Sequence, residues 1–115
     1  MNLYAEARSG ALVVRVDEER LDAAIAISFK DQMREVASQP SPRIILDMSR
    51  VEFLDSSGLG AVVAVMKALA PNRKLELAGL TPNVEKVFRL TRMDSVFRIH
   101  SSAGEAASEG IRNAG

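Results

Sequence analysis

The chain has 115 residues, 47% of them hydrophobic, so it has the length of one domain and enough apolar side chains for a core. Fifteen acidic and fifteen basic residues give a formal net charge of zero, which removes the long-range attraction to nucleic acid or to an anionic membrane. There is no cysteine and one histidine, His100, which excludes both a disulfide framework and a His/Cys metal cluster.

The start of the chain predicts an antiparallel hairpin. Residues 3–8 alternate loosely between apolar and polar, and residues 11–16 are apolar and rich in β-branched side chains. Ser9 and Gly10 between them form a turn signal. An acid and a base within the first eight residues leave no room for the apolar region of a signal peptide, so we expect a cytoplasmic protein.

A helix and a buried strand are expected next. Asp22 is a plausible N-cap for a helix that runs to about Ala37. One apolar face supports the helix and is made of Ile25, Phe29, Met33 and Val36. The Pro-rich segment 38–42 ends it. Residues 43–48 are then almost continuously apolar, which is typical of a strand with parallel neighbours on both sides.

The rest of the chain is organised around residues 51–60 and the apolar run that follows them. A strand-like segment ends, the chain turns through Asp-Ser-Ser-Gly, and a helix begins that should reach about Leu69. Asp and Ser favour a helix N-cap because a side-chain oxygen accepts an orphan backbone N–H. The helix is apolar almost all round, which predicts burial against a sheet. Ser56 and Ser57 then lie at its positive end, a place that suits an anion, including a phosphate added to serine.

The remaining segments complete an alternating pattern. We expect a strand at 74–78, a helix with Thr81 as N-cap and Pro82 as first residue, a short strand at 96–100, and a last helix after a capping box formed by Ser102 and Glu105. The predicted order is β-β-α-β-α-β-α-β-α. This indicates an α/β fold with a mixed, mostly parallel sheet of about five strands, an N-terminal antiparallel hairpin and about four helices.

Each residue of the central stretch also has a purely structural interpretation. Ser56 could be an N-cap worth roughly 1 kcal/mol and nothing more. Ser57 is more simply a helix residue than a second acceptor, and Asp55 could either cap the helix or place a serine hydroxyl. We expect Gly60 to allow close packing of the helix on the sheet. For Gly58, packing and room for an approaching kinase both stay open.

Residues 53–60, Phe-Leu-Asp-Ser-Ser-Gly-Leu-Gly, resemble the signature of anti-sigma factor antagonists (anti-anti-sigma factors), whose fold is the STAS domain. Weaker similarities lie at 21–22, 44–48, 77–84 and 88–93, so the resemblance covers nearly the whole chain. It implies a single STAS domain over residues 1–115.

The resemblance implies partner switching as the function. The dephosphorylated antagonist binds a GHKL-type serine kinase that is also the anti-sigma factor, and so frees a sigma factor to regulate transcription, as in stress responses. The kinase uses ATP and magnesium to phosphorylate the serine after the Asp, and a PP2C-type phosphatase removes the phosphate. On this sequence the acceptor is Ser56, and the partner-binding residues are Asp22, Phe53, Leu54, Asp55, Ser57 and Gly58. The family implies no enzymatic activity, cofactor or metal, and no direct contact with nucleic acid or membrane.

Two residues depart from the family's pattern. Glu19 stands where the family usually has glycine, and Arg20 replaces an acidic residue. The loop beside the acceptor is therefore bulkier and differently charged, which bears on the kinase that it accepts.

Two other functions are compatible with parts of the sequence. STAS domains also serve as subunits of lipid-transport ABC complexes and as regulatory tails of anion transporters, although an intact acceptor serine argues against a tail. A hydrolase would need a triad of Asp55, Ser56 and His100, but the Gly-x-Ser-x-Gly elbow of such enzymes is absent.

Overall fold

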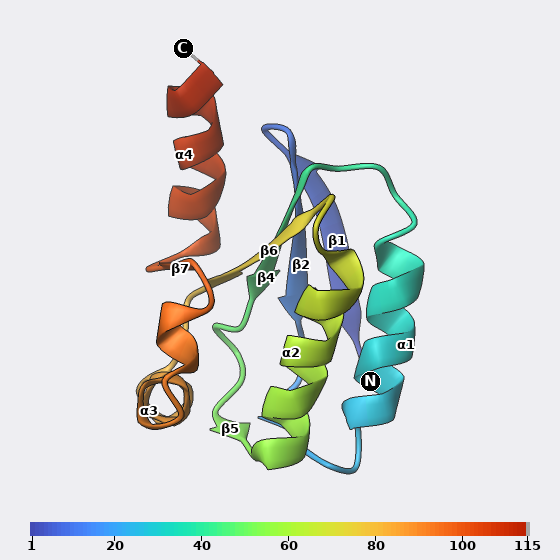
Figure 1. Ribbon diagram of the computed structural model, residues 1–115, viewed down its shortest axis with the longest axis vertical. Helices are drawn as coiled ribbons and strands as arrows, with labels where there is room; N and C mark the ends of the chain where they lie inside the picture. Colours follow the sequence, from blue (N-terminus) through green and yellow to red (C-terminus); the bar gives the residue numbers. More distant parts are fainter. Residues whose placement is uncertain (115) are drawn as a thin grey trace.

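The computed structural model describes residues 1–114, and the side chains of residues 1–109, and within this part a five-stranded sheet forms the centre of the molecule (Figure 1). In spatial order its strands are β1 (Leu3–Arg8), β2 (Ala11–Val16), β4 (Arg43–Asp47), β6 (Lys74–Ala78) and β7 (Ile99–His100). β1 is antiparallel to β2, and the other neighbours run parallel. The predicted mixed sheet with its N-terminal hairpin is confirmed.

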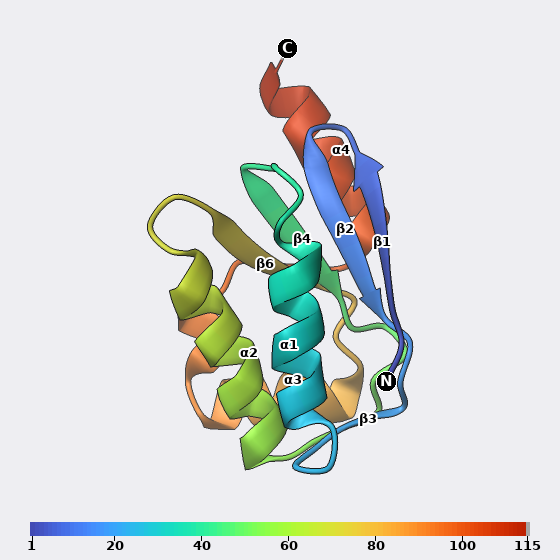
Figure 2. The same ribbon diagram turned by 90° about the vertical axis from the view of Figure 1, so that its right-hand side faces the viewer.

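The described residues contain four α-helices: α1 (Ala26–Val36), α2 (Ser56–Leu69), α3 (Pro82–Leu90) and α4 (Ala103–Ala114). Figure 2 shows α1 and α2 side by side on one face, with α4 behind the sheet. A 3-10 turn, η1 (Met93–Ser95), follows α3. No helix in residues 1–114 is both long enough and apolar enough to cross a bilayer.

The alternation of side chains along the strands divides the core into two parts. The larger part lies under α1 and α2 and includes Leu12, Val14, Ile44, Leu46, Leu77, Phe29, Met33 and Val62. Each such side chain contributes roughly 1.5–3 kcal/mol when it is fully buried. The smaller part lies under α4 and contains Ala11, Val13, Ile45, Ala78 and Ala106. The face of the sheet under α1 and α2 therefore supplies most of the apolar stabilisation, and this packing holds α2 in a fixed position.

Two expectations about element boundaries are wrong. α1 begins at Ala26, because Asp22 forms a tight turn in which its side chain accepts from the Ala24 N–H at 3.1 Å. The last strand is only Ile99–His100, because the backbone N–H of Phe97 still bonds to the carbonyl of Met93 in the preceding turn. The predicted burial of α2 against the sheet is confirmed through Ala61, Val62 and Val65. The opposite side of the helix is exposed, at Ser57, Gly60, Ala64, Lys67 and Ala68.

The predicted helix starts further along the chain are partly confirmed. Thr81 and Pro82 occupy the N-cap and first positions of α3, but the Thr81 hydroxyl donates to the Val51 carbonyl at 2.7 Å rather than capping the helix. Ser102 accepts from the Glu105 N–H at 3.0 Å, which is one half of the expected capping box. The carboxylate of Glu105 accepts a hydrogen bond from the Ser101 hydroxyl instead of completing the box.

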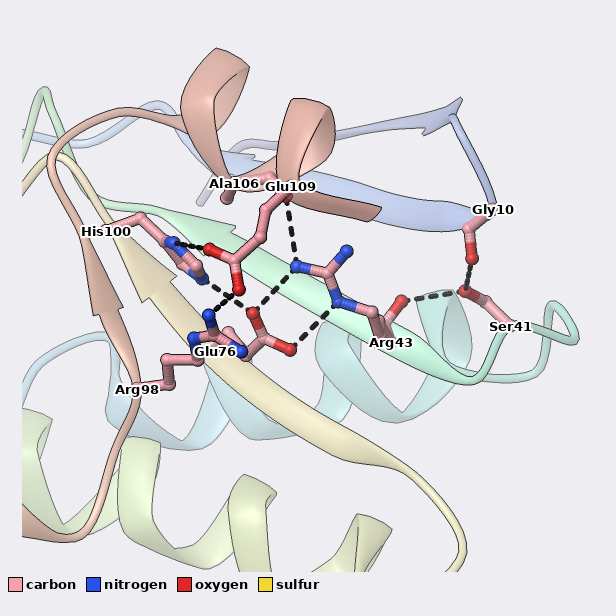
Figure 3. A network of polar contacts seen from close by, with 8 residues as sticks. All are labelled: Gly10, Ser41, Arg43, Glu76, Arg98, His100, Ala106 and Glu109. Atoms are coloured by element: carbon pink, nitrogen blue, oxygen red, sulfur yellow. Dashed lines mark hydrogen bonds and ion pairs between the residues drawn. The ribbon is translucent and has the colours of Figure 1, made fainter. Parts of the chain in front are cut away.

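A buried network of charges fastens α4 to the sheet (Figure 3). Arg43 makes a bidentate pair with Glu76, with N–O distances of 2.8 and 2.9 Å, and also donates to the Ala106 carbonyl at 3.0 Å. The two ring nitrogens of His100 face Glu76 at 2.7 Å and Glu109 at 3.4 Å. Glu109 in turn pairs with Arg98. Because β6 is covered on both faces, the Glu76 carboxylate is buried and needs hydrogen-bond partners. The network supplies them.

This network predicts a pH-dependent stability. The hydrogen bonds from Arg43 hold the pKa of Glu76 at about 2, against an ordinary value of 4.5. Because the folded pKa is the lower one, the stabilisation is fully present above about pH 5 and is lost as the pH falls toward 2. We expect the free energy of unfolding to fall by about 3 kcal/mol more in the wild type than in Glu76→Gln over this range, measured by urea titration at each pH.

The matched control for this titration is Glu85→Gln, an exposed glutamate paired with Arg89. It should keep the pH dependence of the wild type. Parallel pH curves for wild type and Glu76→Gln would contradict the role given to the Arg43–Glu76 pair.

Candidate functional site at the start of α2

Two short strands bring the predicted site residues together. β3 (Arg20–Leu21) and β5 (Phe53–Leu54) form a separate parallel pair in which Arg20 lies opposite Phe53 and Leu21 opposite Leu54. The Glu19 carbonyl extends the pairing by accepting from the Phe53 N–H at 3.2 Å. The two leucines are buried, so they anchor the pair, while Arg20 and Phe53 are exposed. The segment before α1 is thereby held against the segment that ends in Ser56.

Asp55 is the N-cap of α2. One carboxylate oxygen accepts from the Gly58 N–H at 2.8 Å, and the other accepts from the Ala23 N–H at 3.1 Å. The hydrogen bond from Gly58 is the largest cause that lowers the pKa of Asp55; the backbone N–H groups of Ala23 and Ser57 and the charge of Arg20 add to it, against a smaller effect of burial. Asp55 therefore stays ionised and ties the start of α2 to the turn before α1.

Ser56 and Ser57 are the first two residues of α2, and both are exposed. Since Asp55 holds the cap position, the interpretation of Ser56 as an N-cap is wrong. Within the part of the chain that the structure describes, neither serine hydroxyl is hydrogen-bonded to another protein group. The Ser56 hydroxyl is thus open to an incoming reagent and is fixed to a rigid helix.

The structure decides between the roles left open for Gly58 and contradicts the one expected for Gly60. A Cβ atom on Gly58 would lie 2.0 Å from the Leu21 carbonyl oxygen and 2.9 Å from a methyl carbon of Leu54. A Cβ atom on Gly60 would meet nothing within 4 Å. Close packing therefore requires glycine at 58, and the expectation that Gly60 serves packing is wrong.

The other predicted site residues fall into two groups. Leu54 and Gly58 are buried, so they support the site from below. Phe53 is exposed and Asp22 is half-buried, and both contact Arg20. The Asp22 carboxylate accepts from Arg20 Nε at 3.2 Å, and the guanidinium of Arg20 lies 4.0 Å from the centre of the Phe53 ring, which is 40% exposed.

Arg20 is a residue of this site that the sequence reasoning did not select. Its only signal in the sequence was its position next to Leu21-Asp22, where it departs from the family's pattern. Its contact with Phe53 depends on the β3–β5 pairing, which a pair of two-residue strands cannot reveal through periodicity.

The site does not assemble a hydrolase. His100 lies in the network under α4, where its two ring nitrogens face Glu76 and Glu109, so it is not the base of a triad with Ser56. In residues 1–114, no group of three or more His, Cys, Asp or Glu side chains is placed to hold a metal ion. The arrangement brings together the exposed Ser56 hydroxyl and the ionised carboxylate of Asp55. The Arg20 guanidinium, the Asp22 carboxylate and the Phe53 ring are in contact next to them.

Comparison with known proteins matches residues 2–106 to the STAS domain. BtrV of Bordetella bronchiseptica, whose name includes the words anti-sigma factor antagonist, is 30% identical over 98 residues, which are 84% of this chain and 78% of that protein. The anti-sigma-F factor antagonist RsfB of Mycobacterium tuberculosis is 25% identical over 104 residues, 90% of this chain and 84% of that protein.

The fold agrees with these relatives. The crystal structure of an anti-sigma factor antagonist from Mycobacterium paratuberculosis matches with a TM-score of 0.83 at 24% identity, over 94% of this chain and 92% of that one. The resemblance noted at residues 53–60 is therefore confirmed across most of the chain. The chain belongs to the STAS domain family.

Proposed function

We propose that this protein is an anti-sigma factor antagonist whose binding to its partner is switched by phosphorylation of Ser56. The observation that carries the proposal is the Ser56 hydroxyl, exposed and unbonded at the first turn of α2, directly after the cap residue Asp55. The names of the relatives support the choice of role over other roles of the fold.

The partner is a GHKL-type serine kinase that is also an anti-sigma factor. The unphosphorylated protein binds it through the surface around Ser56, made of Asp22, Phe53, Asp55 and Ser57, and so releases the sigma factor. In the kinase reaction, Ser56 Oγ attacks the γ-phosphorus of ATP. The bond from that phosphorus to ADP breaks, and the hydroxyl proton passes to a base of the kinase. A PP2C-type phosphatase hydrolyses the phosphate and restores the binding form.

The scaffold suits such a switch because the hydroxyl sits on a helix whose other face is packed in the core. A phosphate adds about −1.5 to −2 charges at the surface without entering that core. The fold should therefore survive the modification, while any interface formed over Ser56 meets a new charge and a new bulk.

Substitution of Ser56 by alanine should abolish phosphate transfer. The assay incubates the protein with its purified GHKL-type kinase and Mg-ATP and maps phosphate by peptide mass spectrometry. Wild type should gain one phosphate, on Ser56, and Ser57→Ala, the matched control in the same turn, should gain it as well. An equal gain of phosphate in Ser56→Ala, or none in the wild type, would end the proposal.

A further inference from the structure

Two of the backbone N–H groups near Ser56 are already bound. Asp55 accepts from the N–H groups of Gly58 and Ala23 at 2.8 and 3.1 Å. Asp55 and Asp22 also place two carboxylates beside Ser56, and like charges repel. A cation from elsewhere in the protein would therefore stabilise a phosphate at this position.

Arg20 is the cation that the structure holds at this place. The β3–β5 pair holds it opposite Phe53, three residues before Ser56, and its charge reaches Asp55, whose pKa it helps to lower. Arg50, in the neighbouring loop, is already paired with Asp17 at 3.0 Å. The side chain of Arg20 is 59% exposed, so it has space to adopt another rotamer.

The present contacts of Arg20 are weak ones. An exposed guanidinium over an aromatic ring and a single exposed ion pair, here with Phe53 and Asp22, each contribute little because water competes for them. A guanidinium and a phosphate instead form two parallel charge-assisted hydrogen bonds, which are among the strongest in proteins. Because the pair with phosphate is stronger than the present contacts, the Arg20 side chain should move from Phe53 to a phosphate on Ser56.

We propose that Arg20 is the receptor for a phosphate on Ser56 and leaves the Phe53 ring to bind it. The inference rests on the proposed function for the phosphorylation of Ser56. Phosphorylation then changes two properties of the partner-binding surface together. The phosphate neutralises the positive charge of Arg20, and the face of the Phe53 ring becomes exposed. Both features depend on the contact between Arg20 and Phe53.

The test uses protein in which phosphoserine is installed at position 56 during translation, so that no kinase is needed. The second pKa of the phosphate, ordinarily about 6, is measured by phosphorus NMR as a function of pH. A nearby guanidinium favours the dianion and lowers this pKa. We expect Arg20→Gln to raise it by about half a unit, and Arg20→Lys, which keeps the charge without the planar fork, to raise it less.

The matched control is Arg34→Gln, which removes another exposed arginine paired with an aspartate, Asp31 at 3.5 Å, near the far end of α1. It should leave the phosphate pKa unchanged. Equal phosphate pKa values in the wild type and in Arg20→Gln would overturn the inference. Because the phosphate is installed without a kinase, this result is independent of whether a kinase modifies Ser56, and the two proposals can fail separately.

Discussion

Replacing Gly58 with alanine should lower the free energy of unfolding by about 2–4 kcal/mol. The new methyl group would lie 2.0 Å from the carbonyl oxygen and 2.8 Å from the carbonyl carbon of Leu21, far inside any permitted contact. These atoms belong to the backbone of β3, which cannot rotate away as a side chain can. Either α2 must lift from the core or the β3–β5 pair must open. Urea unfolding followed by circular dichroism measures the change.

Gly60→Ala is the matched control, one half-turn further along the same helix. The space around position 60 is open, and alanine is a better helix former than glycine. This variant should be more stable than the wild type by about 0.5–1 kcal/mol. Similar gains of stability in both variants would show that helix propensity rather than contact with Leu21 governs position 58.

Phosphorylation of Ser56 should weaken binding to the kinase partner by about 100- to 1,000-fold. The phosphate adds about −1.5 to −2 charges to a rim that already carries the carboxylates of Asp22 and Asp55. One guanidinium neutralises only part of this charge, and an interface that covers the phosphate must desolvate the rest. An uncompensated buried charge costs several kcal/mol, while each 1.4 kcal/mol is about a tenfold change in affinity. Isothermal titration calorimetry with unphosphorylated protein and with protein carrying phosphoserine at position 56 measures the change.

Two controls separate the effect of position from the effect of charge. Phosphoserine at position 38, an exposed residue just beyond the end of α1, adds the same charge far from the site and should leave the affinity unchanged. Ser56→Ala should bind the partner as the unphosphorylated wild type does, within a few-fold. A phosphate at position 56 that leaves the affinity unaltered would mean that the partner docks elsewhere.

The long elements of the fold could be predicted because each buries one regular face. The strands Ala11–Val16 and Arg43–Asp47 and the helix Ser56–Leu69 have patterns of apolar residues that leave few alternatives. The pair β3–β5 could not be predicted, since each strand has two residues and shows no period. The start of α1 was misplaced because Asp22 forms a turn with the same side-chain chemistry that it would use as a cap.

The position of the candidate site could be predicted, but not its details. The chemistry of Asp and Ser before an apolar run, together with the family resemblance, pointed to the start of α2. Which residue caps the helix was undetermined, because Asp55 and Ser56 are both good capping residues. The roles of Gly58 and Arg20 depend on Leu21 and Phe53 across the β3–β5 pair, and such contacts between distant segments have no local signal.

The central claim is that a surface hydroxyl on a packed helix accepts a phosphate while the fold stays intact. The most direct measurement treats the protein with its GHKL-type kinase and Mg-ATP, locates the phosphate by mass spectrometry, and determines the unfolding free energy of the same sample. We expect one phosphate, on Ser56, and cooperative unfolding within about 1 kcal/mol of the unmodified protein. A phosphate found only at other residues, or a phosphorylated Ser56 with loss of cooperative unfolding, would contradict the claim.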